Sequence, residues 1–369
     1  MLLSNVLRKE NNNLDIFRVV AAVMVIYGHA YALLPMEGQK DIVGRLLVFD
    51  YSGSLAVKIF FFLSGLVVTN SLIEKKDVRQ FLISRFFRIW PALAVVLAAM
   101  AFIFGPLFST HPPLEYFSNT VVYEYFLRGL VMDLRYDLPG VFQNNAFKAA
   151  NGSLWSIPFE VYAYIVLVAI FLLGVIHSRY LSLALFSVIL IDPLVGNKLL
   201  FTWLPQNPEV TLLAPCFAAG SFFILFKDKV EIDLRGLAGV WVLYYLFRIS
   251  SYNFYFFYLA IFYSILFISS RKVLVRFKPA IDISYGLYLW GWPVQQVMAQ
   301  YFPEHGIRFN QIVSTIIAAL LGYLSWHLIE SRFIKIGANF GKRISSKSEK
   351  PFQQPRMPTE SLGSSPLDN

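Results

Sequence analysis

The sequence predicts an all-α, polytopic integral membrane protein, a bundle of about ten transmembrane helices. Of its 369 residues, 57% are hydrophobic and only 15% are charged. The mean hydropathy is +0.56, which is too apolar for an ordinary soluble globule. Apolar stretches recur along the chain at roughly 17 to 25 residues, the length that crosses the hydrocarbon layer as a helix. An aromatic content of 17% suits lipid-facing helices and interfacial belts.

We expect ten spans, because an apolar segment satisfies its own backbone hydrogen bonds in lipid only as a helix. They are residues 14–34, 54–73, 90–108, 156–176, 180–204, 210–226, 236–249, 254–270, 281–301 and 310–333. The seventh is short, and only residues 250–253 separate it from the eighth.

The distribution of basic residues predicts the orientation. Most of the 32 Lys and Arg residues fall into one set of segments. These are the N-terminus, residues 74–89, 177–180, 227–235 and 271–279, and everything from residue 332 onward. Because cytoplasmic loops carry an excess of Lys and Arg, we predict that both termini are cytoplasmic.

Residues 1–340 form one predicted transmembrane domain. Its long external loop, 109–155, carries a half-amphipathic run over 116–134, which either lies on the membrane surface or folds over an external mouth. Residues 341–369 are rich in Ser, Pro, Lys and Gln and have too little apolar content to pack. We predict that they form a disordered cytoplasmic tail.

Several function classes are excluded. The net charge of +9 does not indicate nucleic-acid binding, because the basic residues are dispersed between apolar stretches. The single Cys216 rules out an intramolecular disulfide. No metal is predicted, since the sequence has no HExxH, clustered-Cys or paired-Asp pattern. A GxSxG elbow is also absent, and the sequence does not indicate an oligomeric state.

The first span carries the densest set of ionisable residues. Asp15, Arg18 and His29 share one helical face, and Arg18 and His29 lie three turns apart, about 16 Å along the axis. Charges inside a span are expensive and mark functional candidates. The alternative is structural, with Asp15 and Arg18 as an interfacial pair and His29 hydrogen-bonded within the bundle.

Arg85 and Arg88 lie three residues apart at the predicted cytoplasmic start of the third helix, so their side chains share one face. A planar, permanently charged guanidinium pair suits phosphate recognition. The alternative is simple anchoring of a cytoplasmic loop at the membrane surface.

Trp155 and Glu160 lie where the external loop enters the fourth span. A carboxylate at this place suits the orientation of an acceptor, of an imidazole or of an arginine. Glu160 is equally well explained as a partner of the helix dipole.

The remaining candidate residues lie in or beside the predicted spans. Trp290 or Trp292 suits sugar stacking, and an interfacial aromatic belt is the alternative for both; Trp290 is taken as the candidate. Gln295 offers neutral hydrogen bonds in the ninth span. Lys58 is expected to snorkel to the surface, and Glu330 is expected to form an interfacial pair with a neighbour at the end of the tenth span.

Six motifs, in order, resemble the membrane acyltransferase 3 family, the O-acetyltransferases of surface polysaccharides. In that family an Arg or Lys and an essential His stand on the opening helix with ten residues between them, as do Arg18 and His29. The matching segments are LDIFRVVAAVMVIYGHAYAL, FFFLSGLVV, FLISRFFRIWPAL, NGSLWSIPFEVYAY, SYGLYLWGWPVQQ and HLIE. They span nearly the whole chain.

The resemblance implies an O-acyltransferase that uses acetyl-CoA, or another acyl-CoA such as succinyl-CoA, as a co-substrate, with no permanently bound cofactor. The acceptor is then a hydroxyl of a cell-surface or exported carbohydrate, and the location is the bacterial inner membrane. The resemblance assigns donor binding to Arg85 and Arg88 and a functional carboxylate to Glu160.

The predicted mechanism makes His29 the general base. Arg18 steers the donor or stabilises charge on the thioester oxygen. Trp155, Trp290 and Gln295 are the predicted acceptor-binding residues. Direct transfer and a covalent acyl-histidine both fit the sequence.

The ninth span departs from the family pattern at one position. Many family members have a His where this chain has Gly291, within the run Tyr288 to Pro293. A mechanism that needs a second histidine from that position is therefore in doubt here.

A rival from another class is a polytopic transporter that exports a glycan or a small anion, with Arg18, His29 and Glu160 as a relay. The lack of internal repeats and the ordered motifs speak against it. A non-catalytic scaffold is the third possibility, and it leaves the embedded Arg18 and His29 unexplained.

Overall fold

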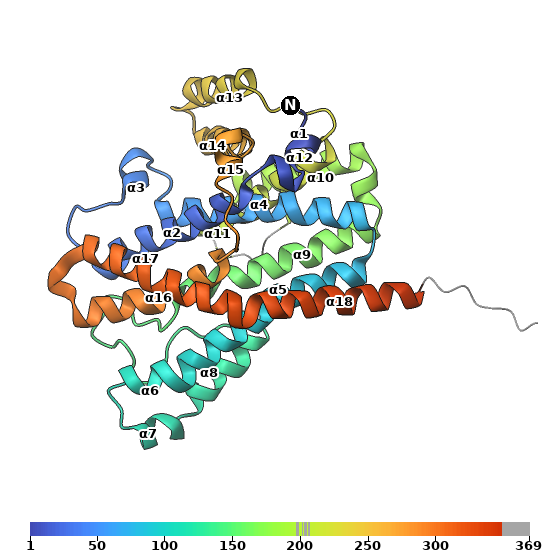
Figure 1. Ribbon diagram of the computed structural model, residues 1–369. Coiled ribbons are helices and arrows are strands. Elements are labelled where there is room, and N and C mark those ends of the chain that lie inside the picture. Colours follow the sequence, from blue (N-terminus) through green and yellow to red (C-terminus); the bar gives the residue numbers. More distant parts are fainter. Residues whose placement is uncertain (197–198, 201, 203–204, 206, 349–369) are drawn as a thin grey trace, which may run out of the picture.

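The computed structural model is built of long helices that run side by side (Figure 1). It describes residues 1–196, 199–200, 202, 205 and 207–348. Over these residues the secondary structure is helical, apart from two isolated bridges that join Leu2 to Glu231 and Ser109 to Val141. Five described stretches are long and apolar enough to cross a membrane, so the predicted all-α membrane class is confirmed. They are Leu14–Leu33, Ser52–Lys75, Val78–Phe108, Gly152–Leu172 and Pro303–Ile344.

The α-helices are α1 (Leu3–Val6), α2 (Leu14–Leu33), α3 (Ile42–Leu46), α4 (Ser52–Lys75), α5 (Val78–Ala99), α6 (Gly105–Phe108), α7 (Pro113–Ser118), α8 (Thr120–Leu130), α9 (Ile157–Leu172), α10 (Arg179–Ile191), α11 (Pro208–Thr211), α12 (Leu213–Leu225), α13 (Leu234–Phe247), α14 (Asn253–Ser269), α15 (Lys272–Arg276), α16 (Ser284–Tyr301), α17 (Gly306–Ser325) and α18 (Ser331–Ser348). The 3₁₀ turns are η1 (Lys9–Asn11), η3 (Gly152–Ser156), η4 (Val175–His177), η5 (Asp192–Val195) and η6 (Pro303–His305). Two π-helical turns are η2 (Met100–Phe104) and η7 (Trp326–Glu330).

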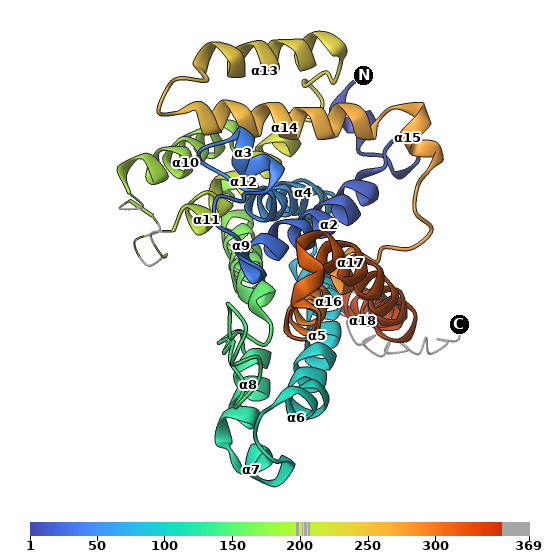
Figure 2. The same ribbon diagram turned by 90° about the vertical axis from the view of Figure 1, so that its left-hand side faces the viewer.

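Every predicted span contains a helix, but not every helix is long enough to cross a membrane. The span predicted over 180–204 is too long, because α10 ends at Ile191, where Pro193 cannot continue the hydrogen-bond ladder. Part of that span lies outside the described residues. The 14-residue α13 packs alongside α14 at the edge of the bundle and buries none of its side chains (Figure 2). Ten membrane crossings therefore remain a prediction.

Helix α4 lies at the centre of the bundle. In its most apolar window 72% of the residues are buried, against 22% to 44% in the four other long stretches. The close approach of α4 to α12 depends on two glycines. A Cβ at Gly65 of α4 would lie 2.1 Å from the carbonyl oxygen of Phe217. A Cβ at Gly220 of α12 would lie 2.2 Å from the carbonyl oxygen of Phe62. Small residues at such crossings let membrane helices pack on backbone contacts.

Two helices continue through π-helical turns and form long rods. The first, α5–η2–α6, begins at Val78 and not near Trp90, so Arg85 and Arg88 lie two and three turns inside a helix. The second joins α17 to α18 through η7 and packs along α5 (Figure 1). Helix α18 reaches Ser348, so the folded part extends past residue 340; the rest of the predicted tail, 349–369, lies outside the described residues.

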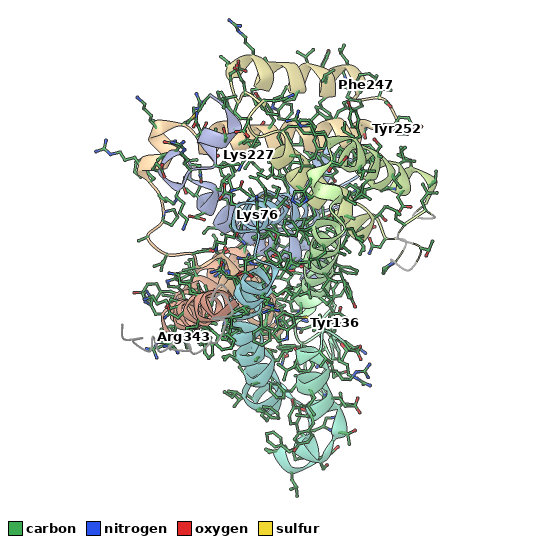
Figure 3. All side chains as sticks on the ribbon, turned by 90° about the vertical axis from the view of Figure 1, so that its right-hand side faces the viewer. Lys76, Tyr136, Lys227, Phe247, Tyr252 and Arg343 are labelled. Atoms are coloured by element: carbon green, nitrogen blue, oxygen red, sulfur yellow. The ribbon has the colours of Figure 1, made fainter. Side chains whose placement is uncertain are left out.

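Backbone hydrogen bonds hold the N-terminus against two turns distant in sequence. The amide of Leu3 donates to the Val230 carbonyl at 2.8 Å, and the amide of Asn13 donates to the Ser269 carbonyl at 3.0 Å. These contacts bring together segments that the charge pattern assigns to one face. Figure 3 looks toward the end of the bundle at the right of Figure 1 and labels Lys76, Lys227 and Arg343 there.

Helices α6, α7 and α8 project as a lobe beside α5 (Figure 1 and Figure 2). The Trp90 Nε1 donates to the Leu130 carbonyl at 2.9 Å, and Gly129 packs against Leu97. The half-amphipathic run therefore packs on a long helix, and it is the later part of the loop, residues 136–155, that helps to line a cavity.

The prediction that Lys58 snorkels to the surface is wrong. Its side chain is 1% exposed, and its Nζ lies 3.2 Å from Oδ1 of Asp50, whose side chain is equally buried. Asp50 also accepts a hydrogen bond of 2.6 Å from the Tyr258 hydroxyl, and Lys58 donates to Ser54. The ammonium finds a full set of partners inside the bundle, so it has no need to reach water.

Replacing Lys58 with Met should lower the free energy of unfolding by about 3–5 kcal/mol, because Asp50 is left as an uncompensated buried charge. Thermal unfolding of the purified protein in detergent measures this loss. Lys75→Met, at the exposed end of the same helix, is the matched control and should change the midpoint little. Equal midpoints for the two variants would contradict the assignment.

Candidate active site

Two cavities lie inside the bundle. The larger one, called the His29 cavity, has a volume of about 1050 Å³ and includes His29, Tyr51, Tyr136, Trp155, Glu209 and Trp292 in its wall. The smaller one, called the arginine cavity, has a volume of about 60 Å³ and includes Arg18, Arg85, Arg88, Glu160, Tyr164 and Tyr288.

The two cavities lie close together, because four elements, α2, η3, α4 and α16, line both. On α4, Ser54 lines the His29 cavity and Val57 lines the arginine cavity, three residues or about 5 Å apart along the axis. On η3, Trp155 lines the first cavity, and Ser156 lines the second. About one helical turn of protein therefore separates them.

The partition is made by η3 and α16. The Tyr288 hydroxyl is 2.6 Å from Oγ of Ser156 and also donates to the Ser153 carbonyl oxygen. Asn151 Nδ2 donates to the Leu289 carbonyl at 2.9 Å. The polar groups of this irregular segment are thus satisfied by α16.

His29 is 8% exposed and faces the larger cavity, against the edge of Trp292 with ring centroids 4.8 Å apart. Its Nδ1 is buried and has no hydrogen-bond partner among the described residues. No carboxylate therefore orients this nitrogen, and contact with the indole ring fixes the plane of the imidazole.

Buried amides hold the turn of α2 that carries His29. Gln295 Nε2 donates to the Ile26 carbonyl at 2.8 Å, and Gln311 Nε2 donates to the Tyr27 carbonyl at 3.0 Å. Gln295 also bonds Asn310 at 3.0 Å. Gln295 is fully buried and lines neither cavity, so the structure places it behind the histidine helix.

In the arginine cavity, Arg85 lies over the ring of Tyr164, 5.9 Å from its centroid. Glu160 accepts hydrogen bonds from Ser64, at 3.1 Å, and from Tyr164. The Nε atoms of Arg18 and Arg85 are buried without a partner among the described residues. Two guanidinium groups thus line one small cavity with unused donors.

Arg88 is held differently. It binds Asp282 at 2.5 Å and Glu330 at 3.2 Å, and Ser325 Oγ donates to Glu330 at 2.8 Å. Asp282 stands two residues before α16 begins at Ser284. Glu330 therefore pairs with α5 and not with a neighbour in its own helix, and Arg88 links α5 to α16 and η7.

The other residues predicted for the site do not lie together in one cavity. Trp155 lines the His29 cavity, whereas Glu160 lines the arginine cavity. Trp290 lines neither cavity and packs against Phe104, with ring centroids 5.8 Å apart. In place of an Asp15–Arg18 pair, Asp15 lies 3.7 Å from Lys278.

Sequence reasoning missed Asp50, Tyr51 and Glu209 in the wall of the His29 cavity, and it did not assign Trp292 to the site. The signal for the first two was an acidic and an aromatic residue directly before an apolar span. Glu209 had no such signal, because its place depends on how α11 packs. Trp292 stands two residues from Trp290, on another face of the same helix.

The departure at Gly291 also has a structural reason. A Cβ at this position would lie 2.8 Å from Cγ1 of Ile26, one turn before His29. The Ile26 side chain occupies the space that the Cβ of a histidine would take. This site therefore works with one cavity-lining histidine among the described residues.

A titratable imidazole in one polar cavity and unpaired guanidinium donors in the next define a membrane-embedded site for group transfer. No group of three metal-ligating side chains occurs over the described part of the chain. The arrangement offers a base on one side of a thin partition and an anion-binding site on the other.

Comparison with known proteins agrees with this class. The acyltransferase domain of the acyltransferase 3 family matches residues 11–329. The chain belongs to this family of membrane acyltransferases. No solved structure shows significant similarity to it.

Among its relatives is an O-acetyl transferase of Shigella phage Sf6, which is 28% identical over 343 residues, 88% of this chain and 96% of the relative. O-acetyltransferase OatA of Staphylococcus aureus is 27% identical over 327 residues, 77% of this chain and 53% of that protein. Nodulation protein 10 of Rhizobium leguminosarum bv. viciae is 39% identical over 90 residues, 24% of each chain.

Gly291→Ala should lower the free energy of unfolding by about 1–3 kcal/mol through overpacking against Ile26. The double variant Ile26→Ala/Gly291→Ala should lose less than the sum of the single variants, because the added methyl then has room. Thermal unfolding in detergent checks this, with Gly239→Ala as control, since no atom lies within 4 Å of a Cβ there. Strict additivity would refute the contact.

Proposed function

We propose that this protein transfers an acetyl group from acetyl-CoA to a hydroxyl of a cell-surface or exported carbohydrate, with His29 as general base. The proposal rests on one observation: a cavity lined by a histidine and a cavity lined by arginines approach within about one helical turn. Membership of the acyltransferase family and two relatives named as O-acetyltransferases support the acyl chemistry.

The donor binds on the arginine side. Arg18 and Arg85 bring unused guanidinium donors, which suit the thioester oxygen of an acyl-CoA. Arg88 is occupied by its ion pairs with Asp282 and Glu330, which fix α5 beside α16 and η7. At about 60 Å³ the cavity is far smaller than the roughly 300 Å³ or more of a site that encloses a drug-sized ligand. It therefore receives the short acyl end, and the nucleotide stays outside.

The acceptor binds in the His29 cavity. At about 1050 Å³ it is as large as the biggest ordinary ligand sites. Its wall combines the aromatic rings of Tyr51, Trp155 and Trp292 with the carboxylates of Asp137 and Glu209. Aromatic faces stack on the apolar face of a sugar ring, and carboxylates accept hydrogen bonds from its hydroxyl groups.

The reaction joins the two sites. The His29 imidazole takes the proton of the sugar hydroxyl, and the oxygen attacks the thioester carbonyl carbon. Arg18 stabilises the negative charge on the carbonyl oxygen. The carbon–sulfur bond then breaks, and the leaving thiolate takes the proton from the imidazolium. Acetyl ends on the sugar, free thiol is the second product, and His29 is neutral again.

The orientation follows from the basic residues. Lys76, Lys227 and Arg343 lie at one end of the bundle (Figure 3), the end that the positive-inside rule assigns to the cytoplasm. In a bacterial inner membrane the donor then comes from the cytoplasm and the carbohydrate from the opposite side, with both termini in the cytoplasm.

Replacing His29 with Gln should lower acetyl transfer by about 100-fold or more, the usual contribution of a general base. The assay gives purified protein labelled acetyl-CoA and membrane glycans and follows product by mass spectrometry. His305→Gln, at a half-exposed histidine paired with Glu304, is the control. Full transfer by the His29 variant at normal protein abundance overturns the assignment, and translocation of glycan without acetylation supports the rival transporter.

Arg85→Lys should raise the KM for acetyl-CoA about 10-fold, because an ammonium cannot reproduce the contacts of a planar guanidinium. A tenfold loss of affinity corresponds to about 1.4 kcal/mol of binding free energy. The kcat should change less. Arg79→Lys, at an exposed position two turns earlier on α5, should keep the native KM. A KM effect of the same size in both variants would show that the contribution is only surface charge.

A further inference from the structure

An apolar groove lies beside the arginine cavity, along α9, α10 and α12. Its volume is about 130 Å³, and its wall includes Ala163 of α9, Leu185 of α10 and Leu213 of α12. Helix α12 packs against both α4 and α9, and the three helices lie close together in Figure 2. Phe61 of α4 is 4% exposed and is the one described residue that lines both the groove and the arginine cavity. Its ring therefore stands between the two spaces.

The wall between the two spaces is thinnest at Phe61. One turn further along α4, a Cβ at Gly65 would lie 2.1 Å from the Phe217 carbonyl oxygen, so α4 and α12 meet there backbone to backbone. On α9, Tyr164 lines the cavity, and Phe217 lines the groove, with ring centroids 6.3 Å apart. Two rings therefore separate the spaces at Tyr164, whereas a single ring separates them at Phe61.

The two spaces differ in polarity. The arginine cavity contains the unused guanidinium donors of Arg18 and Arg85. Among the described residues in the wall of the groove, none is charged, and the serines, Ser182 and Ser221, already form hydrogen bonds of 3.0 Å and 2.8 Å. An opening at Phe61 would therefore lead from a polar site into a space that accepts hydrocarbon and disfavours charge.

We propose that Phe61 determines the length of the acyl group, because its ring closes the arginine cavity on the side of the groove and limits the donor to a short acyl group such as acetyl. This inference rests on the donor side of the proposed function, which places the acyl end of the donor in that cavity. The cavity has a volume of only about 60 Å³. The space that could take a longer chain begins behind the Phe61 ring.

Replacing Phe61 with Ala should open the cavity to the groove. The measurement is the ratio of kcat/KM for hexanoyl-CoA to kcat/KM for acetyl-CoA, with membrane glycans as the acceptor. A single methylene in a hydrophobic pocket is worth about 10- to 200-fold in discrimination, so we expect this ratio to rise at least about 10-fold. Phe61→Val removes less of the ring, should raise the ratio less, and keeps the test available if the Ala variant does not fold. An unchanged ratio in the folded variants overturns the proposal.

Succinyl-CoA distinguishes an opening into the groove from a general loosening of the site. Its acyl group is also longer than acetyl, but it ends in a carboxylate, which an uncharged groove disfavours. The Phe61→Ala variant should therefore gain hexanoyl transfer without gaining succinyl transfer. An equal gain with both donors would show that the site has opened to water, and it overturns the proposal.

The matched control is Phe186→Ala on α10. Phe186 lines the groove and does not line the arginine cavity, so its removal enlarges the groove and leaves the Phe61 ring in place. This variant should keep the native ratio of hexanoyl to acetyl transfer. A rise as large as that of Phe61→Ala would show that the position of Phe61 between the two spaces is irrelevant.

Donor binding separates this inference from the proposed function. In the His29→Gln background, competition of hexanoyl-CoA with labelled acetyl-CoA measures affinity without transfer, and adding Phe61→Ala should shift the affinity toward hexanoyl-CoA. This shift in a protein that transfers no acetyl group to glycans supports the role of Phe61 and overturns the proposed transfer. Acetyl transfer by the native protein, with no shift in affinity or in the kcat/KM ratio, keeps the proposed function and overturns the role of Phe61.

Discussion

A bilayer offers no hydrogen-bond partners, so each charge carried into the bundle has to be matched by another group of the protein. Two networks do this. Lys58, Asp50 and Tyr258 join α4 to α14, and Arg88, Asp282 and Glu330 join α5 to the start of α16 and to η7. Both use charges from segments far apart in the sequence, and together they fix the helices that enclose α2.

Against this background the unmatched groups stand out. The Nε atoms of Arg18 and Arg85 and the Nδ1 of His29 are buried without partners over the described residues. Leaving a polar atom unsatisfied costs about 1–3 kcal/mol, and these three side chains all line cavities. Lys58 and Arg88, by contrast, are paired with carboxylates, so the bundle does neutralise other buried charges. Five other buried side-chain atoms of the described residues, among them Oε1 of Gln295 and Nε of Arg135, also lack a partner but line neither cavity. It is therefore the position of these three side chains beside a cavity that fits the proposed ligand sites.

The positions of the helices could be predicted from the sequence, because apolar length and helix geometry are local properties. The shared face of Arg18 and His29 is of this kind, and both side chains line cavities on α2. The end of α10 was also predictable in principle, since Pro193 follows it directly.

The partners of buried charges could not be predicted. Asp50 lies in a loop before α4, and Tyr258 is 208 residues from it, so no local pattern connects them to Lys58. The choice between Trp290 and Trp292 failed for a related reason. Two residues turn a helix by about 200°, and only the packing of α16 against α2 and η3 decides which ring faces a cavity. The two cavities themselves depend on where residues 136–156 pass through the bundle.

The segment Gly152–Ser156 bears most directly on how transfer is confined. It opens a stretch long and apolar enough to cross a membrane, yet it is a 3₁₀ turn whose polar groups need α16 for satisfaction. Non-helical backbone at this depth is tolerated only where it is buried in protein or lines a cavity, and here it does both. Gly152 permits this, because a Cβ there would lie 2.6 Å from the Trp292 ring that contacts His29. In the proposed mechanism, this partition of about one turn keeps the two cavities apart, leaves a short path for the acyl group and limits loss of the thioester to water.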